Sequence, residues 1–256
     1  SSFRNTRLNL SFFQITHLTI SRMNTERTTL LRIDASCRGE RSLTRMLSSK
    51  FLTEWTHRKP NTIVIERDVG RTPPPFVSEE WIAAAFAKEH DRTDQMNALL
   101  VYSDTCIREL LEASVYVIAV PMYNYGMPAA LKAWVDQIIR VNETFTFDLA
   151  RGDYPLAPVL KDKRLVVLSS RGEFGFAPGD VRADMNHLDP HLKTLERYLG
   201  VVRSWSVSIE YQEFGDDRHS RSKTTALESI PRVVSEVIRD LEYLDLDEQV
   251  RFGGQA

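Results

Sequence analysis

The chain has 256 residues, of which 42% are hydrophobic, and a formal net charge of −2 at neutral pH. This size and apolar content are enough for one large domain, and the charge gives no basic surface for nucleic acid or an anionic membrane. Two cysteines, Cys37 and Cys106, make no disulfide framework, and no apolar run approaches the roughly 20 residues that span a bilayer. We therefore expect a cytoplasmic protein with a small-molecule ligand.

Residues 1–28 differ from the rest of the chain in composition. They carry four arginines and no acid before Glu26, which superficially matches an organellar transit peptide. The alternative, which we favour, is an upstream extension with Met23 beginning the useful chain. In both cases we expect a flexible extension at residues 1–28, one domain at 29–246 and a C-terminal tail at 247–256.

The first strand is predicted at residues 30–33, and apolar residues spaced three to four apart predict a helix at 43–55. The loop between them carries hydroxyl groups at Ser36, Ser42 and Thr44. Backbone N–H groups and the helix dipole favour a phosphate at such a helix N-terminus. The alternative is that Ser42 is simply an N-cap.

The middle of the chain predicts a strand at 62–66 and helices at 78–90 and 94–113. A β-branched apolar run then predicts a central strand at 115–120, which Pro121 ends. The next four residues offer two aromatic rings, a thioether and an amide at the carboxyl end of a buried strand. They are Met122, Tyr123, Asn124 and Tyr125. This set suits a flat heteroaromatic ligand, and an ordinary strand-to-helix loop is the alternative.

The remaining segments continue the alternation. An amphipathic helix is predicted at 129–140, followed at 145–158 by an irregular aromatic segment, which we interpret as a hairpin or a lid. Further strands are predicted at 164–169 and 205–210. Helices are predicted from Asp189 to Gly200 and over residues 225–244.

Five strands alternating with helices predict a doubly wound α/β fold, a five-stranded parallel sheet of order 2-1-3-4-5 with helices on both faces. In this order the loops after the first and third strands face one crevice. We therefore expect the loops at 36–44, 122–125 and 170–173 to converge. A phosphate-suited loop beside a ring-suited loop describes a mononucleotide site. Flavin mononucleotide (FMN) fits better than a dinucleotide, because Gly-x-Gly-x-x-Gly is absent.

The motifs Pro121-Met122-Tyr123-Asn124-Tyr125, Ser169-Ser170-Arg171-Gly172 and Ser42-Leu43-Thr44 resemble those of the FMN-dependent NADH azoreductases, which also reduce quinones. The resemblance runs from about residue 30 to residue 241. It implies a homodimeric, flavodoxin-like oxidoreductase with two FMN sites at the subunit interface. It also implies ping-pong hydride transfer through the flavin from NADH or NADPH to a quinone or azo substrate, with no catalytic side chain and no metal.

Carried over by position, the resemblance assigns twelve residues to FMN. The phosphate would be held by Ser36, Ser42, Leu43 and Thr44, the isoalloxazine lined by Met122, Tyr123, Asn124 and Tyr125, and its pyrimidine edge bordered by Ser170, Arg171, Gly172 and Glu173. The family commonly has glycine where this chain has Glu173. A carboxylate there would disfavour an anionic reduced ring, so we expect its side chain to point away or its backbone alone to bind.

Four phenylalanines are candidates for the outer wall of the substrate pocket, and core packing is the alternative for some of them. They are Phe145, Phe147, Phe174 and Phe176. Two other classes of protein stay open: an electron-carrier flavoprotein without reductase activity, and a cofactor-free interaction module. No ribose-reading motif distinguishes NADH from NADPH.

Overall fold

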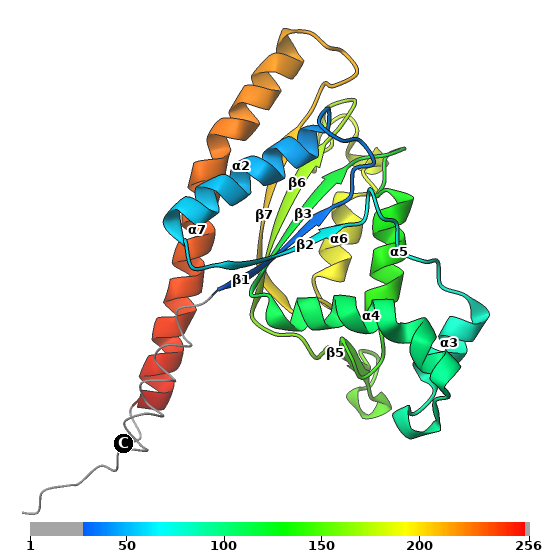
Figure 1. Cartoon of the computed structure of the whole chain (residues 1–256). Coiled ribbons are helices and arrows are strands. Elements are labelled where there is room, and N and C mark those ends of the chain that lie inside the picture. The colour runs from blue at the N-terminus through cyan, green and yellow to red at the C-terminus, as the bar shows by residue number, and fades with distance from the viewer. Residues whose placement is uncertain (1–27, 254–256) are drawn as a thin grey trace, which may run out of the picture.

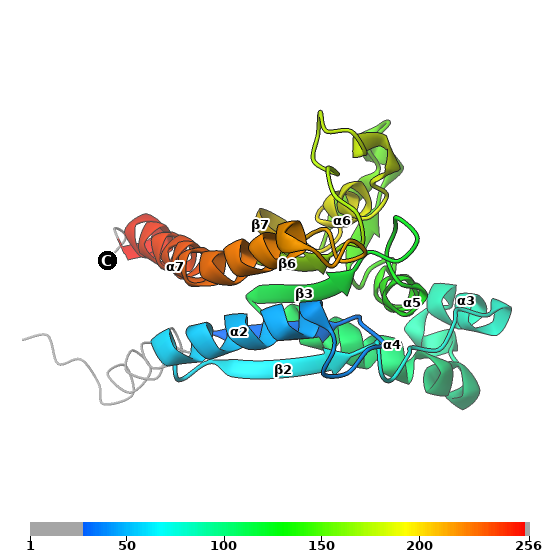
Figure 2. The same cartoon turned by 90° about the horizontal axis from the view of Figure 1, so that it is seen from above.

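The computed structural model describes residues 28–253, so nearly all of the predicted N-terminal extension lies outside the described residues. Five parallel strands form one sheet in the order β2-β1-β3-β6-β7 (Figures 1 and 2). They are β1 (Thr29–Asp34), β2 (Ile63–Asp68), β3 (Val115–Pro121), β6 (Lys163–Ser170) and β7 (Val201–Ile209). Renumbered along the chain, this is the order 2-1-3-4-5, so the predicted doubly wound sheet is confirmed.

Helices cover both faces of the sheet (Figure 1). Helices α2 (Leu43–Arg58) and α7 (Asp217–Gly253) pack on one face, and α4 (Asp94–Glu112), α5 (Ala129–Ile138) and α6 (Asp189–Leu195) pack on the other. Helix α3 (Glu79–Phe86) packs on α4, and 3-10 turns lie at Glu89–Asp91 and Ala183–Met185. Because every residue of β3 is buried, successive side chains feed both cores: Val117 joins the α2 and α7 side and Ile118 joins the α4 and α5 side.

Several boundaries differ from the predicted ones. Helix α3 ends at Phe86, because Ala87 adopts extended backbone angles. Helix α6 ends at Leu195 and β7 begins at Val201, four residues before the predicted strand. Helix α7 begins eight residues early, at Asp217, and continues as far as Gly253. None of the helices within residues 28–253 combines the length and apolar composition needed to cross a membrane.

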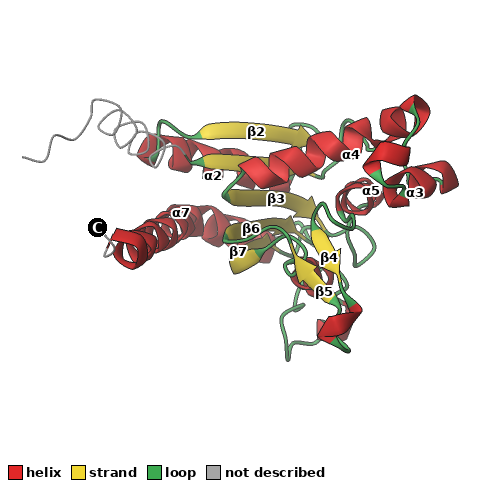
Figure 3. Cartoon of the chain, turned by 90° about the horizontal axis from the view of Figure 1, so that it is seen from below, coloured by secondary structure: helices red, strands yellow, loops and turns green. Residues whose placement is uncertain are grey.

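Residues 145–158 form a hairpin, as one of the two interpretations proposed. Strands β4 (Phe145–Phe147) and β5 (Leu156–Pro158) pair antiparallel around a 3-10 turn at Leu149–Arg151, outside the main sheet (Figure 3). Helix α5 carries the chain from the carboxyl ends of the strands back to their amino ends, so the hairpin lies at the amino edge of the sheet. In Figure 1 it is at the bottom, and the loops after β1, β3 and β6 are at the top.

Candidate functional site

The loops after β1, β3 and β6 line one cavity of about 110 Å³ at the carboxyl edge of the sheet, here called the three-loop cavity. Its lining residues are Ser36, Arg38, Arg41, Ser42, Leu43, Pro121, Met122, Tyr123, Ser170, Gly172, Gln212 and Glu213. The predicted convergence of the loops at 36–44, 122–125 and 170–173 is therefore confirmed. Among the predicted residues, Thr44, Asn124, Tyr125, Arg171 and Glu173 do not line the cavity.

One wall of the three-loop cavity is the N-terminus of α2. Ser42 is its N-cap, with its Oγ accepting a hydrogen bond from the Arg45 N–H at 3.3 Å. The N–H groups of Leu43 and Thr44 belong to the first turn, where no intrahelical acceptor exists. The Thr44 side chain does not reach the cavity, because it is fully buried with its Oγ1 3.2 Å from the Ser42 Oγ. Thr44 has no solvent-exposed surface and does not line the cavity, whereas its neighbour Leu43 does.

The Arg45 side chain holds the loop after β1 in place through hydrogen bonds to its backbone. Its Nη2 donates to the Ser36 carbonyl at 2.6 Å and its Nε to the Arg38 carbonyl at 2.8 Å. The same guanidinium bonds both oxygens of Asp68, at 2.6 and 2.7 Å. Burial raises the pKa of the Asp68 carboxyl, but the hydrogen bonds from Arg45 and from a backbone N–H outweigh it, so the pKa lies below its usual value. Asp68 therefore stays ionised and holds Arg45 against the loop.

Residues 123–126 form a tight turn after β3. Tyr123 and Gly126 exchange two backbone hydrogen bonds of 3.0 Å, and the two residues between them, Asn124 and Tyr125, have φ of 48° and 65°. Two successive positive φ values are those of a type I′ turn, which asparagine tolerates and tyrosine does not favour. Neither Asn124 nor Tyr125 lines the three-loop cavity, so they are available only to a ligand that extends out of it.

Tyr123 connects this turn to the loop after β1. Its hydroxyl lies 3.2 Å from the Cys37 Sγ. Burial, together with the hydrogen bond to Cys37, raises the pKa of the Tyr123 phenol above its usual value. The phenol therefore keeps its proton at neutral pH and is a neutral wall of the cavity.

The loop after β6 contributes Ser170 and Gly172 to the cavity and turns its charged side chains elsewhere. Arg171, expected to border a ring, is buried, with its Nη2 2.5 Å from the Asp189 Oδ2. The Glu173 side chain contacts the Tyr125 hydroxyl and Arg182 and does not line the cavity. This agrees with the first of our two expectations, that the side chain points away. The backbone N–H of Arg171 is also committed, to the Ile209 carbonyl at 2.8 Å.

The four candidate phenylalanines separate into two places. Phe174 stacks on Tyr211 with ring centroids 4.4 Å apart, and Phe176 is buried with its ring 6.3 Å from that of Tyr125. Phe176 is 2% exposed and does not line the three-loop cavity; its ring borders a separate cavity of about 650 Å³ next to α6. Phe145 and Phe147 lie on the hairpin at the opposite edge of the sheet and do not line the three-loop cavity of their own chain.

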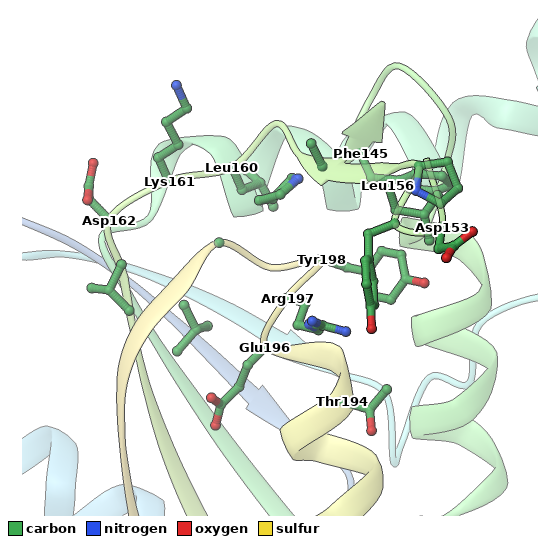
Figure 4. Close-up of a pocket in the computed structure, with 17 residues that line it drawn as sticks. Phe145, Asp153, Leu156, Leu160, Lys161, Asp162, Thr194, Glu196, Arg197 and Tyr198 are labelled. Carbon is green, nitrogen blue, oxygen red and sulfur yellow. The ribbon is translucent and has the colours of Figure 1, made fainter. Parts of the chain in front are cut away.

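A second cavity, of about 610 Å³, lies at this amino edge between the hairpin, the end of α6 and the start of β7 (Figure 4). Phe145 lines it and packs edge-on against Tyr198, with ring centroids 5.4 Å apart. Arg197 and Tyr198 point into it. This amino-edge cavity contains none of the predicted phosphate-binding residues.

Sequence reasoning missed five residues of the three-loop cavity. They are Arg38, Arg41, Pro121, Gln212 and Glu213. The two arginines lie within the predicted loop but were not singled out. Gln212 and Glu213 follow β7, whose carboxyl end shares an edge with the other strands, and that topology was the available signal. Their backbone N–H groups bond the carbonyls of Arg171 and Gly172, at 3.2 and 2.9 Å.

Curated proteins resemble this chain over most of its length. FMN-dependent NADH:quinone oxidoreductase 2 of Colwellia psychrerythraea is 44% identical over 217 residues, which is 82% of this chain and 99% of that protein. A protein of the same name from Idiomarina loihiensis is 46% identical over 216 residues, 82% of this chain and 90% of its own. FMN-dependent NAD(P)H:quinone oxidoreductase 1 of Pseudomonas aeruginosa is 41% identical over 187 residues, 73% of this chain and 88% of its own.

Solved structures share the fold. An azoreductase from Bacillus anthracis has a TM-score of 0.72 at 23% identity, over 82% of this chain and 99% of its own. An FMN-dependent NADH-azoreductase from the same organism, solved in complex with FMN, has a TM-score of 0.72 at 18% identity, with the same coverage. The family model described as the flavodoxin-like fold matches residues 28–231. This chain belongs to the flavodoxin-like family of FMN-dependent NADH:quinone oxidoreductases.

Proposed function

We propose that this chain is an FMN-dependent NADH:quinone oxidoreductase that also reduces aromatic azo compounds. The three-loop cavity is the observation that carries the proposal. The first turn of α2, the hydroxyls of Ser36 and Ser42, and the cations Arg38 and Arg41 meet there. Helix N-termini and arginines bind phosphate through N–H donors and positive charge. The NADH and quinone named for relatives at 44 and 46% identity support the choice of donor and acceptor.

The residues of the cavity fit the phosphate group of FMN by size and by donor chemistry. A volume of about 110 Å³ suits a phosphate group but is well below the roughly 300 Å³ at which whole-ligand pockets begin. The phosphate would lie at Leu43 and Thr44, and the ring would extend over the 122–125 turn. Bound FMN supplies the redox chemistry, passing two electrons from NADH to the acceptor.

The protein supplies position and electrostatics. Met122 and Tyr123 would hold one side of the cofactor, and Gly172 lets the backbone approach on the other. A Cβ on Gly172 would lie 2.6 Å from the Glu213 Cγ, so a larger residue here would displace the Glu213 side chain, which also lines the cavity. The backbone N–H of Met122 is already bonded to the Ser170 carbonyl at 2.8 Å, which leaves Asn124 and Gly172 as the better candidates to stabilise negative charge on the ring.

We propose further that the enzyme is a homodimer with two FMN sites at the interface. One chain encloses the phosphate end only, and α3 and α4 expose large apolar side chains: Ile82 is 48%, Phe86 74% and Val101 61% exposed. Such apolar surface supports a protein partner. Phe147, which is 53% exposed on the hairpin, is then available to line the FMN site of the second copy.

Light scattering tests the dimer. The unmodified protein should have twice the mass of one chain, and Phe86→Asp should have the mass of one chain. A Phe86→Asp variant that remains a dimer would contradict this interface.

We assign the enzyme to the cytoplasm. Both cysteines are free, with Cys37 exposed and Cys106 buried, and an exposed thiol without a disulfide partner is typical of a reducing compartment. Subcellular fractionation followed by immunodetection would test the assignment. Recovery of the protein in an organelle or outside the cell would contradict it.

The activity is tested by recording the visible spectrum of the purified protein and then adding NADH followed by menadione or methyl red. We expect a yellow protein that oxidises NADH continuously only when an acceptor is present. A yellow protein that does not oxidise NADH would instead be an electron carrier. A colourless protein that FMN fails to reconstitute would be an interaction module.

A further inference from the structure

Glu173 bridges two segments beside the three-loop cavity. Its Oε2 accepts a hydrogen bond from the Tyr125 hydroxyl at 3.0 Å, and its Oε1 lies 3.1 Å from both the Nε and the Nη2 of Arg182. The residue immediately before it, Gly172, lines the cavity, and Tyr125 belongs to the turn on which the ring is proposed to lie. The carboxylate is therefore at the border between two of the three loops.

Arg182 is held in place independently of Glu173. Its Nη1 donates to the Phe174 carbonyl at 3.2 Å, and its guanidinium carbon lies 4.6 Å from the centre of the Phe174 ring. Its backbone N–H donates to the Gly175 carbonyl at 2.8 Å. The Arg182 side chain is only 22% exposed and the Glu173 side chain only 32%. The fold therefore specifies the geometry of this pair, unlike that of a mobile surface ion pair.

The charges of the pair cancel locally. Among residues 28–243, for which side chains are described, Glu173 forms an ion pair with Arg182 alone, and Arg182 with Glu173 alone. Removing either partner leaves one uncompensated charge next to the loop that contains Gly172. Because water is partly excluded there, the effective dielectric constant is lower than in bulk water, and the charge interacts more strongly with groups several ångströms away.

We propose that Glu173 and Arg182 form a charge-compensated pair, so that neither charge shifts the reduction potential of FMN bound at the three-loop cavity, an inference that rests on the proposed function. A flavin gains negative charge when it is reduced to its anionic form. A lone carboxylate beside it therefore favours the oxidised cofactor, and a lone guanidinium favours the reduced cofactor. The intact pair does neither. Both are positioning residues, because they act on the cofactor through their net charge and not through chemistry of their own.

The test is a double-mutant cycle on the FMN-loaded enzyme, with the midpoint potential measured by anaerobic reductive titration against a reference dye. Glu173→Gln should raise the potential and Arg182→Gln should lower it. Each should change the ratio of reduced to oxidised FMN affinity about tenfold, which is about 30 mV for a two-electron couple. The double variant should return the potential close to that of the unmodified protein.

A matched control removes one positive charge far from the cavity. Arg232 pairs with Glu236 on α7 at 2.9 Å, and Arg232→Gln should leave the potential unchanged. Thermal unfolding of each variant reports any loss of fold. Shifts of the same sign in both single variants, or a double variant that fails to return, would overturn the inference while NADH oxidation with menadione still supports the proposed function. Failure of the unmodified protein to bind FMN would overturn both.

Discussion

At the scale of single residues, Arg45 and Asp68 determine the shape of the phosphate-suited loop. Arg45 binds two carbonyls of the loop and is itself held by Asp68 at the end of β2. Asp34 lies beside them, and burial raises the pKa of its carboxyl above the usual value despite the opposing charge of Arg32. These two carboxyls therefore affect stability with opposite dependence on pH.

Asp68→Asn should make the free energy of unfolding less dependent on pH in the acid range. The pKa of Asp68 is lower in the folded protein than in the unfolded chain, so its contribution is complete above about pH 4 and is lost as pH falls through the folded pKa. We expect the variant to lose about 1–2 kcal/mol of unfolding free energy at pH 7, with the difference shrinking as pH falls through the folded pKa of Asp68. Urea unfolding across this range measures it, and a difference that is the same at every pH would contradict the assigned pKa.

Asn124→Gly should weaken FMN binding while keeping the turn. Glycine adopts the φ of 48° without strain, whereas alanine there would add about 1–2 kcal/mol of strain and confuse binding with folding. Loss of one amide hydrogen bond should raise the FMN dissociation constant about fivefold to tenfold. Asn142→Gly, at a φ of 66° before the hairpin, is the matched control and should bind FMN normally. Equal affinities for all three proteins would remove Asn124 from the site.

Residue types were predictable at this site, but side-chain directions were not. The hydroxyls of Ser36 and Ser42 line the cavity as expected. Arg171 was expected there too, but it turns to Asp189, eighteen residues later, and to Glu210 in another loop. Sequence spacing carries no information on such partners, because they come together only through the packing of β6, β7 and α6.

At the scale of elements, the N-terminus of α2 combines a structural and a binding role. Ser42→Ala should cost about 1 kcal/mol of stability through the lost cap and should weaken FMN about tenfold more than it weakens riboflavin, which lacks the phosphate. Ser78 caps α3 in the same way, accepting from the Trp81 N–H at 3.2 Å, away from the cavity. Ser78→Ala should cost similar stability with no effect on either ligand. Equal weakening of FMN and riboflavin in Ser42→Ala would place the phosphate elsewhere.

The junction between α6 and β7 depends on Gly200. Its φ is +64°, and a Cβ there would lie 2.2 Å from the Leu160 carbonyl oxygen, a backbone atom that has little freedom to move. Gly200→Ala should therefore cost more than the roughly 1–2 kcal/mol that left-handed strain alone costs. Gly215 has a similar φ of +61° with open space around it, so Gly215→Ala should show the strain alone. Equal losses in urea unfolding would mean that the Leu160 contact is relieved without cost.

The strands and helices were predictable where the apolar pattern is strong, as in the continuous apolar run of β3 and the apolar periodicity of α5. Their ends were harder to predict, because they depend on contacts. The polar residues 217–224 show no apolar stripe, yet they belong to α7. The start of β7 is polar or exposed, with Val202 59% exposed, and pairing with β6 alone extends the strand to Val201.

At the scale of the whole molecule, the three-loop cavity and the amino-edge cavity lie at opposite edges of the sheet. The three-loop cavity is at the carboxyl edge, and the larger amino-edge cavity is beneath the hairpin. Parallel topology made the first location predictable, because all five strands end at one edge. The course of residues 145–158 was not predictable, because a loop after a helix has no periodicity that assigns it to an edge. Volume alone would have selected the amino-edge cavity, of about 610 Å³, or a cavity of about 650 Å³ between Phe176, α6 and β7, whereas donor chemistry selects the much smaller three-loop cavity.

A crystal structure of the protein with FMN tests the central claim most directly. We predict the phosphate within hydrogen-bond distance of the Leu43 and Thr44 N–H groups, and the ring between the 122–125 turn and Gly172. FMN bound in the amino-edge cavity, or with its phosphate away from the N-terminus of α2, would contradict the account.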